Sequence, residues 1–145
     1  MDASLLHQKA EDAREKGDFV EALKYCDEAT VAYQKEDNLI KVAEVQASRV
    51  LTFRHLFEGT NDNLYLTLAK YAAKSGIELI ESNELKTGIS IPLYTLAKVH
   101  ESLGEFEEAK DNIEEALGKI SQDVQARPAV IAEMKTRFAA IRYRI

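Results

Sequence analysis

Two stretches of this chain repeat one pattern of small, large and glycine residues. The first, SLLHQKAEDAREKGDFVEALKYCDEATV, spans residues 4–31, and the second, IPLYTLAKVHESLGEFEEAKDNIEEALG, spans residues 91–118. Shifting the chain by 87 residues aligns identical residues at positions where helices would pack: Leu6 with Leu93, Ala10 with Ala97, Gly17 with Gly104, Phe19 with Phe106, Ala22 with Ala109 and Ala29 with Ala116. An internal repeat at a fixed period predicts an architecture built from copies of one supersecondary unit.

The alanines of each stretch indicate how its helices would pack. A side chain as small as that of Ala10 or Ala97 lets two antiparallel backbones approach closely, and larger groups such as Leu6 and Phe106 fill the gaps between helix pairs. One pair alone cannot bury its apolar face. We therefore expect each pair to stack on a neighbour.

The composition favours helix along almost the whole chain. Hydrophobic residues make up 46% and charged residues 30%, which is typical of a folded globular protein. No segment shows a sustained alternation of apolar and polar residues bounded by Asn-Gly or Asp-Gly turns, so the sequence predicts an all-α fold without strands. Apolar periodicity predicts seven helices, at residues 3–15, 19–35, 39–57, 63–80, 91–103, 106–119 and 128–144. The short polar breaks between them make neighbouring helices antiparallel.

Two of these breaks share one stop-and-start signal. A glycine takes the left-handed position that ends a helix, at Gly17 and at Gly104, and acidic residues follow it. We expect a capping box in the first turn and a weaker one in the second. The acidic residues concerned are Asp18 and Glu21 in the first turn, and Glu105 and Glu108 in the second.

Both stretches resemble tetratricopeptide repeats, whose motif places large, small, aromatic, glycine and alanine residues in this order. The matching positions are Leu93, Leu96, Ala97, His100, Gly104, Phe106, Ala109, Ile113 and Ala116 in the second stretch, and Leu6, Lys9, Ala10, Ala13, Gly17, Phe19, Ala22, Cys26 and Ala29 in the first. The tryptophan and closing proline of the family are missing from both. The resemblance implies one domain over residues 1–145: a right-handed α-solenoid of three antiparallel helix pairs, at about 3–36, 38–82 and 88–121, plus a capping helix at about 126–145.

The middle pair is a degenerate, lengthened repeat. We expect Gly59 to lie in the turn between its two helices. If Ala47 is the small packing residue of the first helix, the register of that helix follows from it. Ala69 and Gly76 are candidates for close approach on the second helix.

The charge balance bears on the partners of the chain. The net charge is −6 at pH 7 and the pI is near 5.2. Phosphate binding needs a cationic surface, so we expect neither nucleic acid nor an anionic membrane as a partner. Cys26 is the single cysteine, and no segment is typical of a signal peptide or a membrane span. A cytoplasmic, reducing location is therefore expected.

No residue pattern indicates an enzyme, a metal site or a cofactor. The three histidines, His7, His55 and His100, lie on different predicted helices without the spacing of zinc ligands. His100 takes the place of a core aromatic, which favours a satisfied buried imidazole. Cys26 is expected to be a small core residue with no cation beside its thiol, a reactive thiol being the alternative.

The resemblance also implies a binding surface, because in tetratricopeptide repeats the first helix of each pair lines a concave groove for a peptide. The corresponding residues here are Ser4, His7, Glu11 and Arg14, then Lys41, Glu44, Ser48, Leu51 and His55, and then Ile91, Tyr94, Lys98 and Glu101. His7 and Glu11 replace the lysine and asparagine with which the best-known grooves of the family clamp a terminal carboxylate. Tyr94 is a candidate anchor for a peptide, although an exposed tyrosine among charges is also ordinary helix surface.

The leading prediction is a noncatalytic adaptor that binds a protein or peptide segment in this groove, as a monomer or a homodimer. Self-association through the last helix is the alternative, because that helix carries an apolar stripe of Ile131, Met134, Phe138, Ile141 and Ile145. A third hypothesis is that the last helix contacts a membrane or nucleic acid, because five basic residues lie between positions 127 and 144 against the single acid Glu133. The acidic remainder of the chain opposes it.

Overall fold

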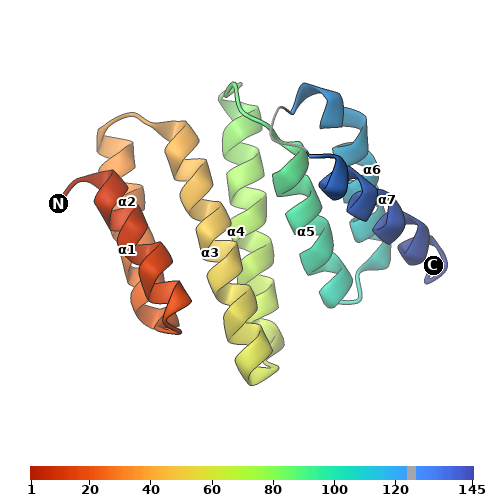
Figure 1. Ribbon diagram of the computed structural model, residues 1–145, viewed down its shortest axis with the longest axis horizontal. Coiled ribbons are helices and arrows are strands. Elements are labelled where there is room, and N and C mark those ends of the chain that lie inside the picture. The colour runs from red at the N-terminus through yellow and green to blue at the C-terminus, as the bar shows by residue number, and fades with distance from the viewer. Residues whose placement is uncertain (124–126) are drawn as a thin grey trace. The chain divides into compact units, whose positions relative to one another are not determined.

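The computed structural model describes residues 1–123 and 127–145, and these residues form helices joined by short turns (Figure 1). The helices are α1 (Ala3–Glu15), α2 (Phe19–Lys35), α3 (Leu39–Thr60), α4 (Asn63–Ser82), α5 (Ser90–Ser102), α6 (Phe106–Lys119), the short 3-10 helix η1 (Ile120–Gln122) and α7 (Pro128–Arg142). No strand occurs in the part of the chain that is described, and the prediction of an all-α fold is confirmed there.

Most predicted helix ends agree with the structure, and the largest difference is at the end of α3. This helix runs on to Thr60 and includes Gly59, so the prediction that Gly59 lies in the turn is wrong. The turn is made instead by Asn61, whose φ of 57° is left-handed. The predicted start of the capping helix at residue 126 lies outside the described residues, and α7 begins at Pro128.

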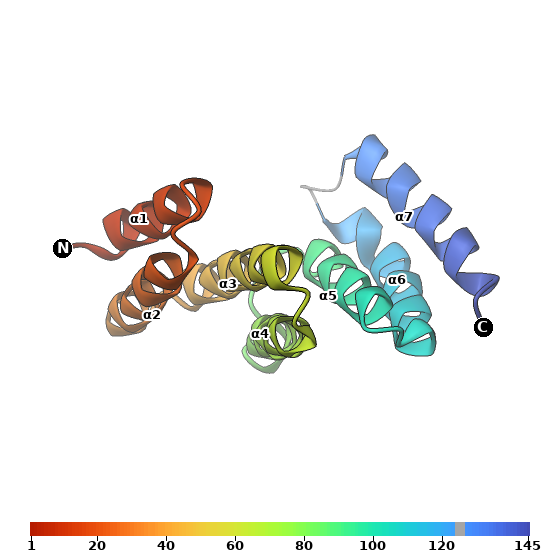
Figure 2. The ribbon, with the colours of Figure 1, turned by 90° about the horizontal axis from the view of Figure 1, so that it is seen from below.

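The chain divides into two compact units, Met1–Leu85 and Lys86–Ile145. In unit 1, α2 lies against α1 and α3, α4 lies against α3, and α1 also touches α3. In unit 2, α6 lies against both α5 and α7 (Figure 2). The boundary at residues 85 and 86 falls in the predicted connection between the second and third repeats.

The two matched glycines make the same turn, as the repeat predicts. Gly17 has a φ of 84° and Gly104 a φ of 78°, a region that glycine adopts without steric penalty. In each turn the amide of the following residue reaches back to a carbonyl near the helix end, which is the Schellman arrangement. These hydrogen bonds run from Asp18 N to Ala13 O and from Glu105 N to His100 O, each 2.9 Å long.

The predicted capping boxes do not form at these turns. Asp18 and Glu105 precede α2 and α6, but neither side chain accepts a hydrogen bond from the opening amides of its helix. Glu105 instead places its Oε1 2.9 Å from Nδ1 of the buried His100. The prediction of a satisfied, buried His100 is thereby confirmed, and its partner is the residue that was expected to cap α6.

The alanines of the repeat pattern are buried in both units. Ala22, Ala29, Ala97, Ala109 and Ala116 have no exposed surface, and Ala10 has almost none. Their burial agrees with the packing role inferred from their small size.

The middle pair follows a different register from the one expected. Ala47 is exposed, so it is not the small packing residue of α3, and Ser48 is buried instead. Close approach occurs at Gly76 on α4, as predicted: a Cβ added there would lie 3.3 Å from Cβ of Gln46 and 3.7 Å from the carbonyl oxygen of Ala43. Ala69 is fully buried.

The apolar stripe of α7 is used mainly for packing within unit 2. Met134 and Ile141 are fully buried, and Ile131 and Phe138 are half-buried. Only Ile145 remains exposed, at 54%. The stripe is therefore not the open adhesive patch that self-association through it would need.

Candidate functional site

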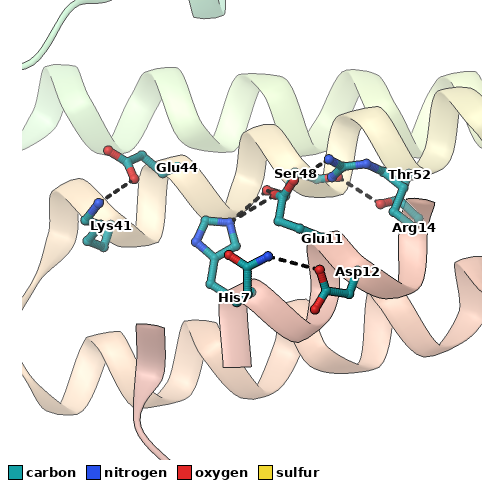
Figure 3. A network of polar contacts seen from close by, with 9 residues as sticks. His7, Glu11, Asp12, Arg14, Lys41, Glu44, Ser48 and Thr52 are labelled. Carbon is teal, nitrogen blue, oxygen red and sulfur yellow. Dashed lines mark hydrogen bonds and ion pairs between the residues drawn. The ribbon is translucent and has the colours of Figure 1, made fainter. Parts of the chain in front are cut away.

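The groove residues of unit 1 form a polar cluster between α1 and α3, which Figure 3 shows from close by. The Ser48 hydroxyl donates a hydrogen bond to Oε1 of Glu11 across 2.6 Å, and Nε2 of His7 lies 2.8 Å from the same hydroxyl oxygen. The guanidinium of Arg14 donates to the other carboxylate oxygen of Glu11. Two residues of α1 that are one turn apart, His7 and Glu11, thus meet at Ser48 of α3, and Arg14 supports Glu11 from the next turn of α1.

The position of Ser48 makes this cluster necessary for the packing of α1 on α3. Ser48 is only 5% exposed, and a buried hydroxyl costs free energy unless it is hydrogen-bonded. One turn further along α3, the buried hydroxyl of Thr52 donates to the carbonyl oxygen of Ser48 at 2.9 Å. The contact between the two helices is therefore a polar seam in which the buried hydroxyls of Ser48 and Thr52 are both hydrogen-bonded.

The Glu11 carboxylate is ionised in this cluster. Its partial burial raises its pKa, but the hydrogen bonds from Arg14 and Ser48 and the positive charge of Arg14 outweigh burial. The net result is a pKa below the ordinary value of 4.5. The negative charge of Glu11 is thus paired with the positive charge of Arg14.

Serine, histidine and glutamate occur together here, but not in the order of a hydrolase triad. In a triad the imidazole stands between hydroxyl and carboxylate and uses a different nitrogen for each. In this cluster the Ser48 hydroxyl donates its hydrogen bond directly to Oε1 of Glu11. A single His7 atom, Nε2, lies near both groups, 2.8 Å from the hydroxyl oxygen and 3.4 Å from Oε1 of Glu11. The geometry orients two helices and does not activate the serine.

Other predicted groove residues of unit 1 lie on one exposed strip of α3. We call this strip the α3 face; its residues, all exposed, are Glu44, Ala47, Leu51 and His55. Lys41 lies beside it, with its Nζ 3.0 Å from Oε2 of Glu44, and this hydrogen bond raises the pKa of Lys41. Leu51 is 41% exposed, and the His55 ring stacks on Phe19 with 5.6 Å between ring centroids.

The predicted anchor of the third repeat, Tyr94, is covered. It is 3% exposed, so the expectation of an exposed tyrosine is wrong. Its hydroxyl donates to Oε1 of Glu133 across 2.5 Å and accepts from Nε of Arg137 at 2.9 Å, and both partners belong to α7. Burial raises the pKa of Tyr94, and so does the hydrogen bond to Glu133.

Two further predicted residues of α5, Lys98 and Glu101, complete this second cluster. Oε1 of Glu101 accepts a hydrogen bond from Nη1 of Arg137 at 2.7 Å, and Nζ of Lys98 lies 4.8 Å from the centroid of the Tyr94 ring. The hydrogen bond from Tyr94 lowers the pKa of Glu133. In unit 2 the predicted groove positions therefore hold α7 in place.

The two clusters occupy equivalent positions in the repeat. The shift of 87 residues superimposes His7, Glu11 and Arg14 on Tyr94, Lys98 and Glu101. In each unit these positions join the first helix of a pair to the helix that follows the pair, α3 in unit 1 and α7 in unit 2. Arg137 of the second cluster is one of the five basic residues that the sequence places between positions 127 and 144.

Cys26 lies in the core of unit 1 without any exposed surface. The charges of Arg49 and Arg14 lower the pKa of the thiol, and those of Asp27 and Glu11 raise it. Burial has the larger effect, and the pKa of Cys26 rises to about 11. The thiol is therefore protonated at neutral pH, as a core residue should be.

Comparison with known proteins identifies no family for this chain. No protein-family model matches the chain, and no curated protein matches it either. Among the described residues, no three histidine, cysteine, aspartate or glutamate side chains are grouped as metal ligands. No described helix combines the length and the apolar character that crossing a bilayer requires.

Proposed function

We propose that this chain is a noncatalytic interaction scaffold of the tetratricopeptide type, which binds a segment of another protein along the α3 face. The repeat assignment is supported by the equal turns at Gly17 and Gly104 and by the buried alanines at matched positions. On this proposal, the helix pairs continue one another as a right-handed solenoid with α7 as its cap.

The observation that carries the binding proposal is Leu51, an exposed apolar side chain in the middle of a polar strip. Burying a leucine side chain stabilises a complex by about 1.5–3 kcal/mol. His55 and Glu44, one and two turns away, add a ring and a charge that orient a partner. An apolar anchor surrounded by polar groups is the usual anatomy of a binding hot spot.

The polar seam prepares this strip for binding. Because Ser48, on the neighbouring side of the same helix, is hydrogen-bonded to Glu11 and lies 2.8 Å from Nε2 of His7, α3 is held against α1 before a partner arrives. A rigid surface loses less conformational entropy on association. Residues of α5 are weaker candidates, since Tyr94 and Glu101 already bind α7.

A noncatalytic role is favoured by the way the polar groups are used. Glu11, the carboxylate of this cluster, has a lowered pKa and accepts hydrogen bonds from Ser48 and Arg14 on its two oxygens. Ser48 is buried beneath it. No group in this cluster is both reactive and open to a substrate.

Site-specific photo-cross-linking tests the proposal. A photoreactive amino acid at position 51 should cross-link a partner in extracts of the native cell, and Leu51→Glu should abolish capture of the same protein. The matched control is Val20, which is more exposed than Leu51 but lies on α2. The same probe at position 20 should not cross-link that protein, and Val20→Glu should leave capture intact. Equal capture from both positions would overturn the assignment to the α3 face.

A further inference from the structure

A second surface of unit 1 has the chemistry of a docking groove. It lies between the first half of α1 and the second half of α2, with a volume of about 760 Å³. We call it the α1–α2 groove; Leu6, Val31 and Ala32 form its apolar part. Val31 is 51% exposed, and the neighbouring Met1 is 71% exposed. Leu6 is only 8% exposed, so Val31 and Met1 are the accessible apolar groups of the groove.

The rim of this groove is acidic. Four carboxylates line it against one cationic side chain, Lys35; they are Asp2, Asp27, Glu28 and Glu36. Asp27 is paired with Arg49 at 2.8 Å, and Asp2 accepts a hydrogen bond from the amide of Leu5 at the start of α1. Glu28 and Glu36 are exposed, and among the described residues neither forms an ion pair. The groove therefore favours an apolar ligand that carries positive charge.

One segment of the same chain has this chemistry. Residues 142–145 read Arg-Tyr-Arg-Ile, at and beyond the end of α7. Tyr143 is 93% exposed and Ile145 is 54% exposed. Arg142 and Arg144 are exposed too, although each guanidinium rests near an aromatic ring of unit 2, Arg144 at 4.5 Å from the centroid of Phe106. Apolar and basic groups thus alternate along the segment.

We propose that the α1–α2 groove of one molecule binds segment 142–145 of a second copy. Tyr143 and Ile145 occupy the apolar part around Val31, and the two arginines meet the carboxylates of Glu28 and Glu36. This contact joins two different surfaces, so each bound molecule offers a further groove and a further segment. It goes beyond the proposed adaptor function, because it uses neither the α3 face nor its partner.

Charge complementarity argues for a second copy as the occupant of this groove. The groove is acidic, and the basic residues outnumber the acid between positions 127 and 144. Opposite charges steer two copies head to tail, whereas contact between two grooves or two segments brings like charges together. The association should weaken as salt screens these charges.

Sedimentation velocity of the full chain over a wide range of concentrations tests the proposal. At low salt the average mass should rise with concentration, and added salt should reverse the rise. Val31→Lys in the groove, or Tyr143→Ser with Ile145→Ser in the segment, should each weaken association by about tenfold or more, since each removes apolar area from the contact. The controls are Val20→Lys on α2 and Tyr71→Ser on α4, two exposed sites outside the contact, and both should associate normally.

Mixing the two variants separates this contact from a symmetric one. The groove variant keeps an intact segment, and the segment variant keeps an intact groove, so an equimolar mixture should form a one-to-one complex that grows no further. A chain that stays monomeric at every concentration would overturn the proposal, as would association that neither variant weakens. A mixture in which the two variants do not bind each other would also overturn it. None of these outcomes depends on capture by the α3 face.

Discussion

The hydroxyl of Ser48 on α3 donates a hydrogen bond to the carboxylate of Glu11 on α1 across 2.6 Å. This bond links the first helices of two successive pairs, which are separated along the chain by the whole of α2. Unit 2 makes the same kind of link with other residues, from Tyr94 on α5 to Glu133 on α7. A repeat position that the resemblance assigns to ligand binding is thus used to join one pair to the next helix.

Ser48→Ala should destabilise unit 1 by about 1–2 kcal/mol, because Glu11 and His7 would lose their shared partner in a half-buried seam. Urea denaturation followed by circular dichroism measures the change. Ser102→Ala is the matched control: its hydroxyl is exposed and donates only to the carbonyl of Lys98 in its own helix. Its effect should be within about 0.5 kcal/mol. Equal losses in both variants would contradict a special role for Ser48.

The stabilising effect of Glu11 should depend on pH. Its folded-state pKa lies below the ordinary value of 4.5, so its ionised form stabilises the fold at pH values above 4.5. This contribution is lost as the pH falls through the folded-state pKa, because the carboxylate is then protonated in both states. Glu11→Gln cannot ionise. The difference in unfolding free energy between wild type and Glu11→Gln should therefore be largest near neutral pH and shrink in acid. A difference that grows on acidification would refute the charge assignment.

Gly88→Ala should destabilise unit 2 by about 1–3 kcal/mol. A Cβ at position 88 would lie 2.4 Å from the carboxylate of Asp123, which is buried and hydrogen-bonded to the Ser90 hydroxyl at 2.5 Å. The measurement is thermal unfolding followed by circular dichroism. Unfolding at the wild-type temperature would show that this contact relaxes without cost.

Two controls isolate the Gly88 clash. Gly118→Ala adds a methyl group in α6 where nothing lies within 4 Å, so it should stabilise by up to about 1 kcal/mol through helix propensity. In an Asp123→Ala background, Gly88→Ala should add little further loss, because the obstructing carboxylate is gone. A full additional loss in that background would place the strain elsewhere.

The left-handed turns predict opposite effects of exchanging glycine and a larger residue. Gly17→Ala places a side chain at a φ of 84°, which should cost about 1 kcal/mol. Asp37 already holds a φ of 56° at the end of α2, so Asp37→Gly should stabilise unit 1 by a smaller amount, reduced by the greater freedom of glycine in the unfolded chain. Chemical denaturation of both variants checks the signs. The same sign for both would contradict the turn assignment.

Cys26 should react slowly with an alkylating reagent in the native protein. It is fully buried and its pKa is about 11, so neither access nor thiolate is available at neutral pH. The control is the same protein in concentrated denaturant, where the thiol should react at the rate of a free cysteine. Equal rates in the two conditions would show that the core of unit 1 is open.

Local pattern predicted the turns and the buried alanines well. Gly17 and Gly104 adopt the expected left-handed conformation, because the φ they require is set by the backbone and is open mainly to glycine. Ala22 and Ala109 are buried as expected, because only a small side chain fits where two helices touch. Such features depend on neighbours a few residues away, which the sequence displays directly.

Polar partners were harder to predict than packing. Asp18 and Glu105 have the sequence of helix caps, yet neither caps its helix, and Glu105 binds His100 instead. The register of α3 was also predicted wrongly, because Ser48, and not the neighbouring Ala47, is the buried residue. A long or rotatable polar side chain can reach several hydrogen-bond partners, and the sequence does not show which of them it binds.

The sequence by itself determined that this chain folds as paired helices with glycine turns, because helix propensity, side-chain size and backbone freedom are properties of each residue and its near neighbours. Only the tertiary structure decided which polar faces stay open. Tyr94 and Leu51 both occupy groove positions by the repeat pattern, but α7 covers Tyr94 and leaves it 3% exposed, whereas Leu51 remains 41% exposed. That difference arises because the covering helix lies more than thirty residues away along the chain from Tyr94, and its docking depends on contacts such as that of Arg137 with Glu101.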